Sequence, residues 1–242
     1  MRWKPLSEVV GFYGLVLLSI WVGQSLGLRG QVWIGAVLLL GATVVSSRKH
    51  GDGRDRLGLG RNTLGPAARL TLIYAGPALL LLAIVALFRP APPWPKILFG
   101  VLGYPLWAFA QEYALLSFAA NRLEEGLGQK PALVSTVNGL LFALVHTPNP
   151  VLMGACLLSG WVFTKIFLKT RNIFPLALAH ALGGFLLSWI LLNQYNGMMV
   201  GPSYWKWAGT PGPHPSVINR CSTSLLWYRC GCSSDGTRSN PG

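Results

Sequence analysis

The sequence has 242 residues, of which 52% are hydrophobic and only 11% are charged, and its formal net charge is +13. Several uncharged runs are long enough to cross a bilayer as helices, which excludes a single soluble domain. The basic residues lie in short connections between these runs, where they set membrane topology, and this excludes nucleic-acid binding. We therefore predict an all-α polytopic membrane bundle of about seven transmembrane helices, with six to eight as the range.

The apolar runs give the predicted helices in chain order. The first run begins after Arg2 and Lys4, but it is too long for a signal peptide and lacks a cleavage site, so we interpret it as a retained helix. The predicted helices cover residues 9–28, 31–46, 70–88, 97–120, 132–146, 151–168 and 173–193.

The segments between the runs are polar or rich in Gly and Pro. Residues 48–69 are basic and Gly-rich, residues 89–96 are Pro-rich, and residues 121–131 are expected to form a polar loop. We expect residues 1–200 to form one integral-membrane domain, and residues 201–242 to form a polar, disordered tail.

The basic residues also predict an orientation. With a cytosolic N-terminus, thirteen of the 20 Lys and Arg residues fall on the cytosolic side and seven fall outside. This asymmetry predicts a multi-pass protein of the cell membrane with its N-terminus in the cytosol and its C-terminus outside. In that topology His146 ends a helix that runs outward, whereas Glu112 and His180 lie nearer the cytosol. Either the helix of residues 132–146 begins deeper, or the break at Pro148 is buried inside the bundle.

Glu112 is the only acidic residue within the apolar segments. A charged side chain at the centre of a bilayer costs about 2.5 to 3.5 kcal/mol on insertion scales, so such a residue indicates a functional site. The alternative is a protonated, hydrogen-bonded acid that joins helices. His146 and His180 are its candidate partners. Taken alone, His146 is also typical of a histidine at a helix end, and His180 of a packed core histidine.

Asn138, Phe142 and His146 recur at a spacing of four residues and therefore share one face of their helix. We predict that Phe142 and Asn138 contact a substrate beside His146. Two imidazoles and one carboxylate match the ligands of a catalytic zinc ion, so Glu112, His146 and His180 are also candidate metal ligands. The same groups suit general-base activation of water, and the spacing does not distinguish these two uses.

Three motifs resemble those of a known family. Residues 111–118 read QEYALLSF, residues 142–146 read FALVH and residues 180–184 read HALGG. They resemble the motifs E-E-x-x-x-R, F-x-x-x-H and H-x-x-x-N of the CPBP intramembrane proteases, which are related to the type II CAAX prenyl endopeptidases. The resemblance implies a helical bundle with a cavity recessed in the membrane. It also implies that the first-motif glutamate and the second-motif histidine activate a water, while the third-motif histidine and asparagine stabilise the oxyanion.

Three residues depart from the family pattern. The general-base glutamate falls on Gln111 and its neighbour on Glu112, while the arginine falls on Leu116 and the asparagine on Gly184. An amide does not accept a proton as a carboxylate does, leucine cannot pair with Glu112, and glycine has no side-chain donor.

These motifs lead to three hypotheses of different classes. The first is an intramembrane endopeptidase that cleaves a membrane-associated or lipidated protein: Glu112 and His146 prime the water, and His180, with Gln111 as a donor, stabilises the intermediate. The second is a catalytically degenerate relative that binds a membrane peptide or acts as an immunity-type protein. The third is a haem protein that uses His146 and His180 as axial ligands.

Overall fold

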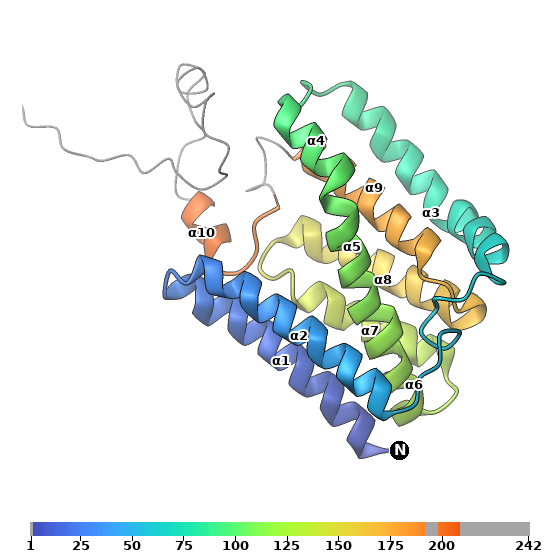
Figure 1. Cartoon of the computed structure of the whole chain (residues 1–242). Coiled ribbons are helices and arrows are strands. Elements are labelled where there is room, and N and C mark those ends of the chain that lie inside the picture. The colour runs from blue at the N-terminus through green and yellow to red at the C-terminus, as the bar shows by residue number, and fades with distance from the viewer. Residues whose placement is uncertain (1, 192–197, 209–242) are drawn as a thin grey trace, which may run out of the picture. The chain divides into compact units, whose positions relative to one another are not determined.

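The computed structural model describes residues 2–191 and 198–208, and within them the backbone is helical apart from short connections and one isolated β-bridge. This confirms the all-α fold predicted from the apolar runs. Figure 1 shows the arrangement of the elements. They are α1 (Trp3–Ser25), α2 (Arg29–Lys49), α3 (Leu64–Leu87), α4 (Trp94–Leu102), α5 (Tyr104–Glu112), η1 (Tyr113–Ala120), α6 (Asn121–Leu127), α7 (Pro131–Leu144), α8 (Pro150–Thr170), α9 (Phe174–Ile190) and α10 (Pro202–Ala208).

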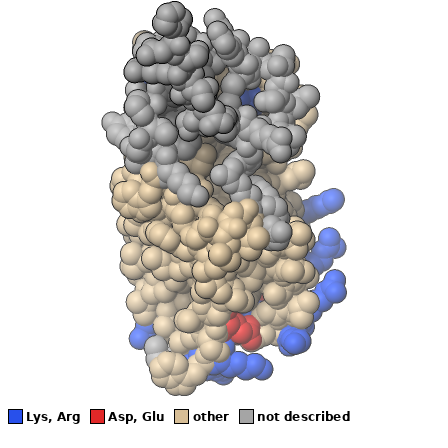
Figure 2. Space-filling view, turned by 90° about the vertical axis from the view of Figure 1, so that its left-hand side faces the viewer, with Lys and Arg blue, Asp and Glu red and all other residues tan. Residues whose placement is uncertain are grey.

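Three described helices, α1, α3 and α8, are long and apolar enough to cross a membrane, and α7 and α9 are shorter apolar helices. Large apolar side chains such as Leu80, Leu87 and Phe88 are exposed on α3 and its end. On the face shown in Figure 2, Lys and Arg project at one end and along one edge, and uncharged residues form the broad area between them. A surface of this kind is suited to a lipid bilayer.

The packing of the helices brings the candidate residues together. Helix α7 packs against α8, while α3 and α5 both pack against α9. Helix α1 packs against α2 and α6, and α2 also contacts η1. Glu112, on α5, therefore lies on an element that directly contacts the helix carrying His180.

The helix predicted at residues 97–120 is interrupted. Gly103 separates α4 from α5, where Pro105 lacks a backbone donor and the Phe99 ring lies 2.8 Å from the place of a Cβ on Gly103. Directly after Glu112 the chain continues as a π-helix, η1. Asn138 Nδ2 donates to the Leu115 carbonyl within it at 2.9 Å. This tertiary bond holds a carbonyl inside the irregular turn, and such turns are frequent at functional sites.

The polar loop predicted at residues 121–131 is wrong over its first half, because residues 121–127 form α6. Asn121 and Arg122 are fully buried. Arg122 Nη2 lies 2.6 Å from Asp52 Oδ2, and Arg122 Nη1 lies 2.9 Å from Glu125 Oε1. The charges that indicated a solvated loop are thus neutralised by one another, which allows the segment to be both helical and buried.

The other boundaries shift by a few residues. Helix α1 begins at Trp3 and α3 at Leu64, both earlier than the apolar runs. Helix α10 covers Pro202–Ala208, so helical structure continues past residue 200, where we placed the domain end. The rest of the predicted tail, residues 209–242, lies outside the described residues.

The break between α7 and α8 is partly buried, since Pro148 is half-buried and Pro150 is exposed. Asn149 is fully buried, and its Oδ1 accepts a hydrogen bond from Leu152 N at the start of α8. The Gly201 amide also donates to the Thr147 carbonyl at 2.7 Å. The depth of His146 in the membrane stays a prediction, and the buried Asn149 is compatible with a break inside the bundle.

Candidate active site

Glu112 is the last residue of α5 and is completely buried. Its Oε1 accepts a hydrogen bond from His180 Nδ1 at 2.7 Å. Its Oε2 is also buried, and no described residue donates to it. A buried carboxylate oxygen without a donor is costly unless a water or a ligand satisfies it, so Oε2 marks a place where a small polar group is expected to bind.

His180 lies on α9, which begins with Phe174 and Pro175, a proline at a position where helices tolerate it. Its side chain is 13% exposed. Because an ionised carboxylate only accepts, Nδ1 of a neutral His180 carries the hydrogen, and Nε2 keeps a lone pair. Glu112 thereby fixes both the orientation and the tautomer of this imidazole.

His146 lies in the turn after α7, and its Nδ1 is 2.7 Å from the Phe142 carbonyl oxygen. The carbonyl can only accept, so Nδ1 donates and Nε2 of the neutral ring is an acceptor. The Phe142 ring stands edge-on to both imidazoles, with centroids 5.0 Å from His146 and 5.7 Å from His180. One aromatic ring thus connects the two histidines.

The other two candidates differ in their surroundings. Asn138 is fully buried, and its Nδ2 donates to the Leu115 carbonyl and to Thr164 Oγ1, each at 2.9 Å. These bonds tie η1, α7 and α8 together beneath the histidines, so Asn138 holds the elements of the site in place. Gln111 is half-buried next to Glu112, and neighbouring helical positions point about 100° apart.

A catalytic zinc ion would require Glu112, His146 and His180 to converge on one point. Within residues 2–191 and 198–208, no three His, Cys, Asp or Glu side chains gather closely enough to hold a metal ion. Glu112 and His180 are paired, whereas the Nδ1 of His146 is bonded to the Phe142 carbonyl. The described residues as placed do not form a three-ligand zinc site.

Two departures from the family pattern have structural consequences. Leu116 is fully buried within an apolar cluster that includes Phe163 and Leu176. At Gly184, an added Cβ would lie 2.2 Å from the Tyr104 hydroxyl oxygen. Tyr104 was not among the residues predicted from the sequence, because no local pattern shows that the start of α5 meets the middle of α9.

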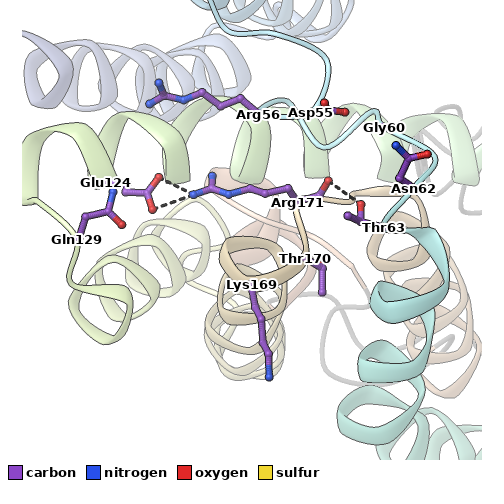
Figure 3. Close-up of a pocket in the computed structure, with 10 residues that line it drawn as sticks. All are labelled: Asp55, Arg56, Gly60, Asn62, Thr63, Glu124, Gln129, Lys169, Thr170 and Arg171. Carbon is purple, nitrogen blue, oxygen red and sulfur yellow. Dashed lines mark hydrogen bonds and ion pairs between the residues drawn. The ribbon is translucent and has the colours of Figure 1, made fainter.

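A separate polar region lies at the end of α6. It includes a pocket of about 650 Å³, which is lined by Asp55, Arg56, Gly60, Asn62, Thr63, Glu124, Gln129, Lys169, Thr170 and Arg171 (Figure 3). Arg171 Nη2 lies 2.7 Å from Glu124 Oε2, and Arg171 Nη1 donates to Asn121 Oδ1 at 2.6 Å. None of Glu112, His146 and His180 lines this pocket, so it is distinct from the candidate site.

Comparison with known proteins finds a family that part of the chain resembles. Residues 92–186 match the family model described as type II CAAX prenyl endopeptidase Rce1-like. No curated protein and no solved structure matches the chain. The match covers 95 of the 242 residues and includes Glu112, His146 and His180. It confirms the resemblance inferred from the three motifs.

Proposed function

We propose that the chain is an intramembrane endopeptidase that hydrolyses a peptide bond in a membrane-associated, lipidated protein. The observation that carries the proposal is the buried carboxylate of Glu112, which has one oxygen bonded to His180 and the other without a donor. The family match supports a protease of the CAAX type, and the exposed apolar helices support a reaction at the membrane.

The proposed chemistry uses two acceptors of the site, the Glu112 carboxylate oxygen Oε2 and the His146 imidazole nitrogen Nε2. A water bound at Glu112 Oε2 gives its proton to that oxygen while its own oxygen attacks the peptide carbonyl. The Nε2 lone pair of His146 accepts the second hydrogen of the water and orients it. His180 positions Glu112 through the bond to Oε1. Protonated Glu112 then returns the proton to the leaving amine, which balances the reaction.

This assignment changes one role inferred from the family. His180 was expected to donate to the oxyanion, but its Nδ1 hydrogen is already used by Glu112. Glu112, one position after the usual base, has a carboxylate oxygen without a donor that can take a proton, which the amide oxygen of Gln111 cannot do. Gln111 remains a candidate donor to the substrate.

A specific observation favours the second candidate, a relative that binds a membrane peptide without cutting it. Leu116, where the family has an arginine, is packed in an apolar cluster and leaves Glu112 without a cationic partner from that position. Among the described residues, His180 is therefore the one hydrogen-bond partner of the Glu112 carboxylate. A cleavage assay decides between the two candidates.

The assay measures cleavage of a farnesylated peptide by purified protein in lipid vesicles, with and without chelator. We expect weak cleavage by the wild type, reduced by about 10²- to 10⁴-fold in Glu112→Gln and strongly reduced in His146→Ala. The first variant loses the base that takes the proton of the water, and the second loses the imidazole that accepts its other hydrogen. Glu124→Gln is the matched control, since it makes the same change at a glutamate paired with Arg171 outside the site. Undiminished cleavage in Glu112→Gln would refute the assignment of the base. Absence of cleavage by every variant, together with retained peptide binding, would support the binding candidate.

A further inference from the structure

Tyr104 fills the space beside Gly184. Its hydroxyl oxygen lies 2.2 Å, and its Cζ 2.7 Å, from the place that a Cβ on residue 184 would take. No Cβ approaches a heavy atom that closely, so any side chain at residue 184 would have to displace the tyrosine. The glycine and the tyrosine are therefore complementary, and the missing side chain at residue 184 is replaced in space by a phenol from another helix.

The Tyr104 hydroxyl is close to the candidate site and is not engaged elsewhere. The Tyr104 ring stands edge-on to the His180 ring, with 6.3 Å between centroids. Gly184 is one helical turn beyond His180 on α9. Among the hydrogen bonds of the described residues, none involves the Tyr104 hydroxyl. A phenol next to the paired histidine thus retains its donor hydrogen.

Hydrolysis of a peptide bond requires such a donor, because negative charge develops on the carbonyl oxygen as the water attacks. The neutral histidines do not offer one at the start of the reaction. His146 and His180 each use the Nδ1 hydrogen for a bond to another protein group, which leaves Nε2 as an acceptor. Leu116 and Gly184 have no polar side-chain atom and cannot donate, whereas the Tyr104 ring stands edge-on to His180 and carries a hydroxyl donor.

We propose that the Tyr104 hydroxyl donates a hydrogen bond to the oxyanion of the tetrahedral intermediate, from the space that Gly184 leaves open. The inference rests on the proposed peptidase function and adds the catalytic residue that the motifs lack. The phenol keeps its proton throughout, so no bond to oxygen breaks at Tyr104. The contribution is electrostatic and is greatest when the carbonyl oxygen carries its full negative charge.

The test begins with Tyr104→Phe, which removes the hydroxyl and keeps the ring against His180. We expect kcat to fall by about 10²- to 10³-fold with KM little changed, because the lost bond forms only in the transition state. Tyr74→Phe is the matched control, since Tyr74 is 62% exposed on α3 and outside the site. A kcat for Tyr104→Phe within about threefold of the wild type would overturn the proposal.

A second test moves the hydrogen-bond donor from residue 104 to residue 184. Gly184→Asn alone should lose most activity, because its Cβ would overlap the Tyr104 hydroxyl. Combining it with Tyr104→Ala makes room for the carboxamide, and we expect the double variant to cleave at least about tenfold faster than Tyr104→Ala alone. A double variant that cleaves no faster than Tyr104→Ala, while melting at the same temperature, would contradict the inference. A wild type that cleaves nothing would instead remove the proposed function, and the inference with it.

Discussion

At the scale of single residues, Arg122 is a cation buried inside the described structure. Its side chain is fully buried, as is that of Asp52, and the two are joined by a contact of 2.6 Å between Nη2 and Oδ2. Glu125 provides a second contact, and His50 connects Glu125 with Glu8 on α1. This group of residues links α1, the loop after α2, and α6. Its stability depends on charge balance, because an unpaired ion in that place would be poorly solvated.

Arg122→Met should therefore destabilise the protein by about 3 kcal/mol, because it removes the closer of the two ion pairs of the buried Asp52 side chain and leaves it only the contact with Arg56 Nε at 3.1 Å. Adding Asp52→Asn should restore part of that loss, so the double variant should melt above Arg122→Met in detergent micelles. Arg54→Met, at an exposed position of the same loop, is the control and should melt near the wild type. A double variant that melts below Arg122→Met would show that the pair is not coupled as the structure indicates.

The sequence could identify Glu112 but not Arg122 or Tyr104, for a physical reason. An acid in an otherwise apolar run is conspicuous, since its desolvation cost predicts a functional role. Arg122 lies among other charges, where solvation is the ordinary expectation, and its burial depends on Asp52, which is distant along the chain. The role of Tyr104 likewise depends on a contact with Gly184 across two helices. Tertiary contacts of this kind leave no local pattern.

At the scale of elements, the contact between α7 and α8 depends on two glycines. A Cβ on Gly139 would lie 2.9 Å from the Leu157 carbonyl oxygen, and one on Gly160 would lie 3.1 Å from the Gly139 Cα. The two backbones therefore touch at this level, as small residues allow in membrane helices. Phe142 is one turn beyond Gly139, and it contacts both imidazoles. The spacing of these helices consequently sets the position of the site.

Gly139→Ala should force the two helices apart and destabilise the protein by about 1 to 3 kcal/mol, with a parallel loss of cleavage because Phe142 and His146 shift. Gly154→Ala is a matched control on α8, since a Cβ there meets nothing within 4 Å. The control should be neutral or slightly stabilising, because alanine favours the helix. Equal melting temperatures for Gly139→Ala and Gly154→Ala would contradict the close packing.

The helices can be predicted from the apolar runs, whereas the places where a helix is interrupted depend on tertiary contacts. The seven predicted segments all contain helix in the structure, because burial and backbone hydrogen bonding in lipid favour it. The π-helix after Glu112 was not predicted, and its Leu115 carbonyl accepts from Asn138 on another element. Helix α6 was assigned to a loop because its charges were counted one by one, without their partners.

At the scale of the whole molecule, the placement of charge is the main clue to orientation. The polar pocket, Arg122 and Arg171 lie among the connections that the charge count assigns to the cytosol. Asp52 lies in the basic connection after α2, but its side chain is fully buried against Arg122. A cysteine there would both disrupt the ion pair and be hidden from reagent. Arg54, exposed in the same loop, is the better position.

The topology prediction is that the loop containing Arg54 faces the cytosol, while the Pro-rich connection containing Ala91 faces outside. The reason is that cytosolic connections of membrane proteins carry an excess of Lys and Arg. After replacement of Cys156, Cys221, Cys230 and Cys232, single cysteines at Arg54 and Ala91, both exposed, are treated in intact cells with an impermeant maleimide. Ala91→Cys should react in intact cells, and Arg54→Cys should react only after the membrane is permeabilised. Reaction of both in intact cells would contradict the model with a cytosolic N-terminus, and an exchange of the two results would reverse the orientation of the bundle.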